Sequence, residues 1–280
     1  MKVILAENAG FCFGVKRAMK LAFESARNSD LPIYSLGPLI HNPQQVEILS
    51  QKGVHEISDL ESLKSDDVLI IRSHGTTPSI LDFAKAKGLK IVDATCPFVV
   101  NAQKLAQELN SEGYQVIIVG EGDHPEVVGI MGFTKNEAWV IDKASTIQNL
   151  SKKNRIGVVA QTTQSFENFR EVVSALLEKC DELKVFNTIC HATTQRQESA
   201  IKLAKRVDLM IVIGGHNSAN TNRLTSLCKQ YITTYHIEIA DEIDKSWFDG
   251  IEIVGVTAGA STPEWIVDDV IEKLTNINNK

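Results

Sequence analysis

The stretch KIVDATC at residues 90–96 places a short apolar strand, a polar link and a cysteine in that order. The same order occurs in KVFNTIC at residues 184–190 and in KVILAENAGFC at residues 2–12. Each cysteine is followed by a helical pattern that carries the tripeptide Lys-Leu-Ala. Side chains at the carboxyl end of a parallel strand point into the functional crevice of an α/β unit. The three stretches therefore predict one α/β unit used three times, with a cysteine at its functional end.

Strand-like apolar runs alternate with helical patterns along the chain, which is typical of parallel α/β units. The third unit ends without the strand that should lead to a cysteine, and the opening strand at residues 2–5 supplies the missing piece. We predict three pseudo-threefold-related α/β domains with mostly parallel sheets around a central site. Their expected bounds are 13–96, 97–189 and 190–280, with residues 1–12 completing the third. Ordinary alternation in an unrelated α/β protein is the alternative, and the matching cysteines argue against it.

The three matching cysteines, Cys12, Cys96 and Cys190, are the predicted metal ligands. Three converging thiols form a soft ligand set that suits an iron–sulfur cluster, with one iron left open to hold substrate. Zinc is the alternative, but zinc sites usually show closely spaced pairs, and these cysteines lie far apart in the sequence. Cys180 and Cys228 fall in helical patterns, and we expect both to be inert, helix-borne thiols.

Composition excludes several classes of protein. The net charge of −6 over 280 residues argues against a general binder of nucleic acid or anionic membranes, since both need a basic surface. No apolar run approaches the roughly 20 residues of a membrane helix. The N-terminal sequence MKVILAENAGFCFG lacks the basic and long apolar regions of a signal peptide. We therefore expect a bacterial, cytosolic protein without a disulfide framework.

Polar residues follow the predicted strands at the end that carries the cysteines. His41, His74 and His124 occupy equivalent positions around the predicted centre, and Thr162, Ser218, Asn220 and Ser261 follow other strands. Such neutral or weakly basic donors, together with backbone N–H groups at helix starts, suit phosphate oxygens. Neither a P-loop nor a dinucleotide fingerprint occurs, which disfavours a nucleoside triphosphate or a dinucleotide.

Ordinary structural roles remain open for many of these residues. A histidine at a strand end is more often a packed or capping residue, which is the role expected for His55, His191 and His236. Serine, threonine and asparagine before a helix are usually N-caps, which is the alternative for Thr76, Thr77 and Ser165. Glu126 either favours the start of its helix through the dipole or donates a proton in the crevice.

Nine motifs of the chain resemble those of the 4-hydroxy-3-methylbut-2-enyl diphosphate reductases, which carry out the last step of the methylerythritol phosphate route to isoprenoids. They are AGFCFGVKRA, GPLIHNP, IRSHGT, DATCPFV, GEGDHPEV, AQTTQS, NTICHATTQRQ, GGHNSANTNRL and VTAGASTP. The resemblance runs from Lys2 to Leu274. It implies a [4Fe-4S] cluster on Cys12, Cys96 and Cys190, and electrons from a small flavodoxin or ferredoxin. The implied reaction is a two-electron reductive dehydroxylation to isopentenyl diphosphate and dimethylallyl diphosphate.

The resemblance also implies roles for the polar residues. Glu126 would deliver protons, with Thr162 and His124 ordering the relay. Diphosphate binding is implied for His41, His74, His124, Thr162, Ser218, Ala219, Asn220 and Ser261. The family often has serine where this chain has Ala219, so a hydroxyl contact is lost there while the backbone N–H remains. A non-catalytic iron–sulfur redox sensor is the alternative, and the acidic charge and the lack of a helix-turn-helix pattern weigh against it.

Overall fold

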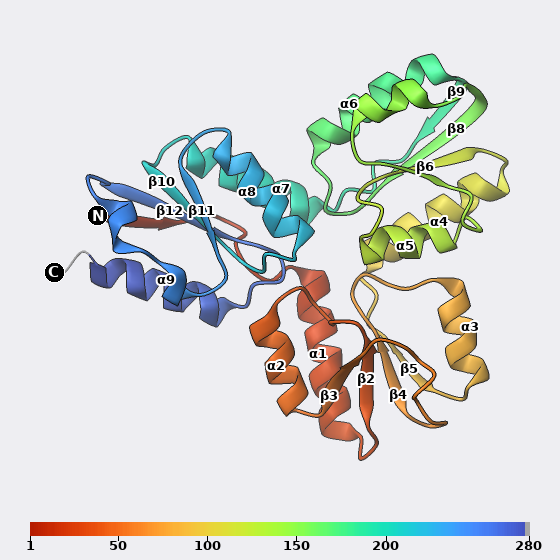
Figure 1. The fold of residues 1–280 in the computed structure, drawn as a ribbon, viewed down its shortest axis with the longest axis horizontal. Helices are drawn as coiled ribbons and strands as arrows, with labels where there is room; N and C mark the ends of the chain where they lie inside the picture. The colour runs from red at the N-terminus through yellow and green to blue at the C-terminus, as the bar shows by residue number, and fades with distance from the viewer. Residues whose placement is uncertain (278–280) are drawn as a thin grey trace. The chain divides into compact units, whose positions relative to one another are not determined.

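The computed structural model of the protein describes residues 1–277, and within them it contains three sheets of four parallel strands (Figure 1). This confirms the predicted α/β class. One sheet has the order β3-β2-β4-β5. Its strands are β2 (Ile33–Leu36), β3 (Val54–Ile57), β4 (Val68–Ile71) and β5 (Lys90–Asp93). The helices of this part of the chain are α1 (Phe13–Asn28), α2 (Pro43–Gln51) and α3 (Pro78–Ala86).

The next sheet along the chain has the order β7-β6-β8-β9. Its strands are β6 (Gln115–Val119), β7 (Trp139–Ile141), β8 (Lys153–Ala160) and β9 (Cys180–Val185). The α-helices are α4 (Pro97–Ser111), α5 (Pro125–Gly132) and α6 (Phe166–Leu176). Two short 3₁₀ helices, η1 (Ala144–Asn149) and η2 (Leu177–Lys179), complete this part.

The remaining sheet has the order β1-β12-β10-β11, so it joins the first strand of the chain to the last three. Its strands are β1 (Lys2–Leu5), β10 (Leu209–Ile213), β11 (Thr234–Ile237) and β12 (Ile253–Ala258). Its helices are α7 (His191–Ala204), α8 (Ala219–Lys229) and α9 (Glu264–Ile277), with the 3₁₀ helices η3 (Ala240–Glu242) and η4 (Lys245–Phe248). The pairing of β1 with β12 is parallel and runs from Lys2 opposite Ile253 to Leu5 opposite Val256.

The three sheets share one topology. In each, the strand that leads to a matching cysteine is an edge strand, and these strands are β1, β5 and β9. The strand beside it, β12, β4 or β8, is the one that precedes it in the repeated unit. Central strands such as β4 and β10 are buried along their whole length, because helices cover both faces of a parallel sheet and leave no alternation of polar and apolar residues.

The chain divides into two compact units. One comprises Met1–Lys16, Ile40–Val46 and the chain from His191 onward, and it contains the sheet that includes β1. The other comprises Arg17–Leu39 and Glu47–Cys190, and it contains the other two sheets. The three domain boundaries expected from the sequence remain a prediction.

The two cysteines expected on helices differ. Cys228 lies in α8, where burial raises the pKa of its thiol to about 12 and keeps it protonated and inert. Cys180, by contrast, begins strand β9 and pairs with Lys153, so its expected place on a helix is wrong. The helical pattern before it gives way at Leu176 to the 3₁₀ turn η2, which returns the chain to the sheet.

Within residues 1–277, none of the helices combines the length and the apolar composition that crossing a lipid bilayer requires.

His236, on β11, makes the folding stability depend on pH. Burial lowers the pKa of its ring below the ordinary value of 6.5, although a ring nitrogen contacts the carbonyl oxygen of Gly214 at 2.7 Å. At a pH just below 6.5 the unfolded chain therefore binds more protons than the folded chain. The stability that comes from keeping the His236 ring neutral is lost as the pH falls. We expect the melting temperature of His236→Gln to fall less steeply than that of the wild type between about pH 7 and pH 5. The exposed residue His55, changed to glutamine, is the control, and equal slopes for wild type and His236→Gln would contradict the assignment.

Candidate active site

Each of the three matching cysteines directly precedes a helix: Cys12 precedes α1, Cys96 precedes α4 and Cys190 precedes α7. The Cys12 sulfur accepts a hydrogen bond from the N–H of Val15, at 3.5 Å, in the first turn of α1. All five cysteines lie in the described part of the chain, and none is in a disulfide there. A thiol placed directly before a helix in each repeat is a soft donor that suits a metal ligand.

One backbone hydrogen bond recurs in all three repeats and holds each cysteine. The cysteine N–H donates to the carbonyl oxygen of the residue two places beyond the end of the neighbouring strand. The bonds are Cys12 to Ala260 at 3.3 Å, Cys96 to Ser73 at 3.0 Å and Cys190 to Thr162 at 2.9 Å. The strand ends concerned are those of β12, β4 and β8. The repeat seen in the sequence is thus a repeat of local hydrogen bonding around the thiol.

Glu126 and Thr162 form a buried pair. The Glu126 side chain is 1% exposed, and its carboxylate accepts two hydrogen bonds from Thr162, one from the backbone N–H at 2.6 Å and one from the hydroxyl at 2.8 Å. The carbonyl oxygen of Thr162 in turn accepts the N–H of Cys190. A carboxylate predicted to move protons is therefore linked, through one threonine, to a predicted metal ligand.

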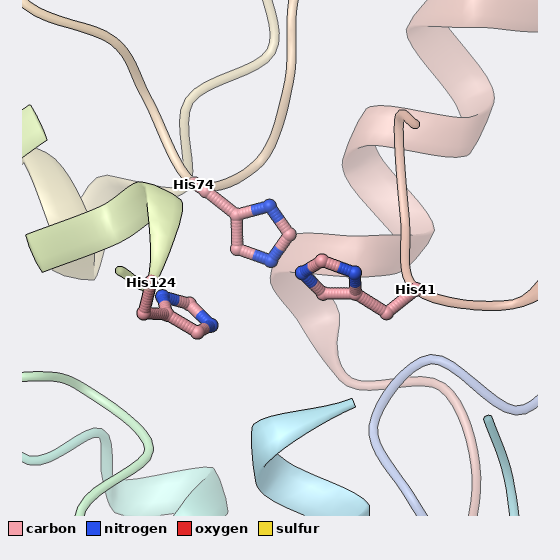
Figure 2. Close-up of side chains that lie close together, drawn as sticks. All are labelled: His41, His74 and His124. Carbon is pink, nitrogen blue, oxygen red and sulfur yellow. The ribbon is translucent and has the colours of Figure 1, made fainter. Parts of the chain in front are cut away.

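His124 is the N-cap of helix α5, and its ring nitrogen Nδ1 accepts the N–H of Glu126 at 3.2 Å. This capping bond places the imidazole and the carboxylate on the same turn of chain. The His74 ring meets the His124 ring edge to face, with 5.3 Å between their centroids and 89° between their planes (Figure 2). His74 lies in the turn after β4, where Gly75 adopts a φ of +73° that favours glycine. The structure therefore brings together two of the three histidines expected to bind diphosphate within one compact unit.

The other compact unit contains the remaining polar candidates. The Ser261 hydroxyl donates to the carbonyl oxygen of His41 at 3.0 Å, and so ties the His41 segment to the turn after β12. Ser218 is the N-cap of α8, where its hydroxyl accepts the N–H of Thr221 at 3.3 Å. The Nδ2 atom of Asn220, in the first turn of that helix, is buried and has no hydrogen-bond partner in the part of the chain that the structure describes. An unsatisfied buried amide beside a helix N-terminus is suited to an anionic ligand.

Three side chains that support the cysteines were missed by the sequence analysis. Arg17 donates to the carbonyl oxygens of Thr95 and Asp93, directly before Cys96. The Thr188 hydroxyl bonds both backbone groups of Ala160, so it fixes the chain before Cys190 to the end of β8.

The third missed side chain, Arg196, acts in the same way. Arg196 is 3% exposed and donates to the Gly10 carbonyl oxygen at 2.7 Å, two residues before Cys12. Gln161 accepts the N–H of Glu121 at 3.0 Å, and so joins the turn after β8 to the turn that leads to His124. In these contacts, polar side chains bond to backbone groups that are distant in the sequence. The one signal of them in the sequence is that the side chains lie near the cysteine and histidine motifs.

These features define a class of parallel α/β protein. Each repeat has a thiol directly before a helix, and histidines and a buried carboxylate follow the strand ends. Residues 3–275 match the family model described as LytB protein. The 4-hydroxy-3-methylbut-2-enyl diphosphate reductase of Trichlorobacter lovleyi is 52% identical over 280 residues, covering 100% of this chain and 99% of the relative. The reductase of the same name from Geobacter sulfurreducens is 51% identical over 281 residues, covering 100% of this chain and 99% of the relative.

Two solved structures are similar over nearly the whole chain. One, of an (E)-4-hydroxy-3-methyl-but-2-enyl diphosphate reductase, is 48% identical, covers 99% of this chain and 100% of its own, and has a TM-score of 0.73. The other, of the E-1-hydroxy-2-methyl-but-2-enyl-4-diphosphate reductase from Plasmodium falciparum, is 28% identical, covers 98% of this chain and 88% of its own, and has a TM-score of 0.93. The chain belongs to the LytB family of 4-hydroxy-3-methylbut-2-enyl diphosphate reductases. This confirms the family resemblance, and the alternative of a redox sensor has no support among these relatives.

Thr162→Val keeps the backbone N–H bond to Glu126 and removes the hydroxyl bond. A hydrogen bond to a charged group contributes about 1.5–3 kcal/mol, so we expect the free energy of unfolding to fall by about that amount. Chemical denaturation measures it. Thr275→Val on α9 is the control, since it removes an exposed hydroxyl bond to the carbonyl oxygen of Ile271 and should change stability by less than about 0.5 kcal/mol. A loss at Thr162 no larger than that at Thr275 would show that the pair does not stabilise the fold.

Proposed function

We propose that this chain reduces (E)-4-hydroxy-3-methylbut-2-enyl diphosphate to isopentenyl diphosphate and dimethylallyl diphosphate. The reaction takes up two electrons and two protons, breaks the allylic C–O bond, forms one C–H bond and releases water. Family membership along nearly the whole chain supports the substrate and the reaction. The observation that carries the proposal is the buried Glu126 carboxylate, hydrogen-bonded to Thr162, whose carbonyl oxygen holds Cys190.

The cofactor we propose is a [4Fe-4S] cluster held by Cys12, Cys96 and Cys190. The donor set fits it, because these are soft thiols at helix starts, partly exposed and outside any disulfide in the described residues. The N–H of Val15, which contacts the Cys12 sulfur, would stabilise a thiolate there. When bound, such a cluster supplies electrons one at a time and, at an iron without a protein thiolate, a Lewis acid.

Substrate binding is assigned to the polar strand ends. His41, His74 and His124 are proposed to donate to the diphosphate, together with the side chains of Ser218, Asn220 and Ser261 and the Ala219 backbone N–H. The side-chain amide of Asn220 supports this assignment, because its Nδ2 finds no acceptor within the described residues and lies in the first turn of α8, where a helix N-terminus favours an anion. The diphosphate does no chemistry, and its binding energy would orient the hydroxymethyl group.

Glu126 is the proposed proton donor, with Thr162 and His124 fixing its position. A proton delivered to the departing hydroxyl turns it into water, a much better leaving group. Positioned acid catalysis of this kind contributes about 10²–10⁴-fold in rate. The electron donor is proposed to be a small flavodoxin or ferredoxin, and the site of action the bacterial cytoplasm.

Glu126→Gln tests the proton donor. The amide retains an oxygen that accepts the Thr162 N–H but cannot deliver a proton. We expect turnover with a reduced one-electron dye to fall by about 10²–10⁴-fold, while the affinity for inorganic diphosphate stays unchanged. Glu167→Gln, at the exposed first turn of α6, is the matched control. Unchanged turnover in Glu126→Gln would remove this residue from the mechanism.

Cys96→Ser tests the metal ligands. Serine replaces a soft thiolate by a hard hydroxyl, so protein purified without oxygen should lose the brown chromophore and most of its iron and sulfide. Cys180→Ser changes a cysteine that begins β9 and should keep the chromophore of the wild type. A Cys96→Ser variant with normal colour and normal iron content would overturn the ligand assignment, and zinc in place of iron would overturn the cofactor.

A further inference from the structure

Gln103, on helix α4, is a buried polar residue to which the proposed reaction gives no role. Its side chain is 5% exposed, and among residues 1–277 its amide nitrogen Nε2 has no hydrogen-bond partner. Leaving a buried donor unsatisfied costs free energy, which an apolar side chain of similar size would avoid. A polar group retained at such a cost calls for a functional explanation.

The amide of Gln103 is wedged between two backbone segments. A methyl group added at Gly75, in the turn after β4, would lie 2.6 Å from Nε2, and one added at Gly129, on α5, would lie 3.3 Å from it. A methyl group would thus displace the amide from its position at Gly75 and press tightly on it at Gly129. The carbonyl oxygens of His74 and Thr76 lie 3.7 Å and 3.6 Å from the same position at Gly129, so acceptors are close to the unused donor.

These two segments carry two of the histidines proposed to bind diphosphate. Gly75 follows His74 in the sequence, and Gly129 lies on the helix that His124 caps. The two imidazoles meet edge to face at 5.3 Å between centroids, so their spacing depends on how closely the turn and the helix approach each other (Figure 2). Gln103 fills the space between the two backbones that set this spacing.

We propose that Gln103 is a positioning residue for diphosphate binding. Its amide sets the distance between the His74 turn and the start of α5, and its free N–H fixes that distance by donating to a carbonyl oxygen of the turn when the histidines close on the anion. This inference rests on the proposed function, since it requires these histidines to bind diphosphate. It assigns to Gln103 no contact with the ligand itself.

Gln103→Met separates positioning from stability. Methionine has a similar length and no donor, so the melting temperature should stay equal or rise, while the affinity for inorganic diphosphate should fall about ten- to a hundredfold. Titration calorimetry on full-length protein purified without oxygen measures the affinity, and the Michaelis constant should rise with kcat unchanged. A residue with only a structural role would lose affinity together with stability.

Thr257→Val is the matched control for the stability half of this test. It removes a buried, unpartnered hydroxyl from β12 and should raise the melting temperature without changing diphosphate affinity. Gly129→Ala is a second variant that keeps every polar group, and its methyl should push on the amide and weaken binding. The double variant Gly129→Ala/Gln103→Ala should lose less affinity than the sum of the losses in Gly129→Ala and Gln103→Ala. Alanine at position 103 leaves room for the methyl group at position 129.

Three outcomes would overturn the positioning role of Gln103, and the third would also refute the proposed function. Wild-type affinity in both Gln103→Met and Gly129→Ala would overturn the role of Gln103 and leave the proposed function intact. Additive losses in the double variant would also overturn it, because the two positions would then act separately. Wild-type protein that neither binds diphosphate nor turns over the hydroxymethylbutenyl diphosphate would refute the proposed function, and this inference with it.

Discussion

The hydrogen bond from each matching cysteine N–H to the neighbouring turn is the constraint on which the functional end of this protein depends. A buried backbone N–H needs an acceptor, and here the acceptor always lies two residues past the end of the adjacent strand. The depth of each sulfur is therefore set by the sheet, which is rigid, and not by the loop that carries the cysteine. Moving a strand end by one residue would move both the thiol and the polar side chain that shares its turn.

Hydrogen bonds also fix the side chains in the turns that follow the strands. Thr162 uses its N–H and hydroxyl for Glu126 and its carbonyl oxygen for Cys190, so one residue serves two proposed tasks. His124 and Ser218 are N-caps, which is the ordinary role of such residues, and capping also holds them at the helix end where an anion would sit. Capping and ligand binding are therefore compatible explanations for these positions.

The sequence alone predicted the strands, the parallel sheets and the repeat, because buried parallel strands and helices leave strong periodic patterns. It misplaced Cys180, since a helical pattern does not reveal the 3₁₀ turn that ends it. It also missed Arg17 and Arg196. Their partners are backbone oxygens distant in the sequence, and a backbone oxygen is the same whatever the residue type, so no sequence pattern marks it. The bond from Ser261 to the His41 carbonyl oxygen spans 220 residues and has no local signal either.

The order of the strands bears on how the chain is made. Among the strands that the structure describes, β1 leaves the ribosome first and its partner β12 leaves it last. β1 therefore stays without its partner while β2–β11 are synthesised, whereas the other two sheets consist of strands that follow one another along the chain. Cys12 gains its hydrogen bond to Ala260 only after that interval. Cys96 and Cys190 can thus gain their hydrogen bonds before β12 is made, whereas a group that needs all three sulfurs in place would be bound only after Ala260 has been synthesised.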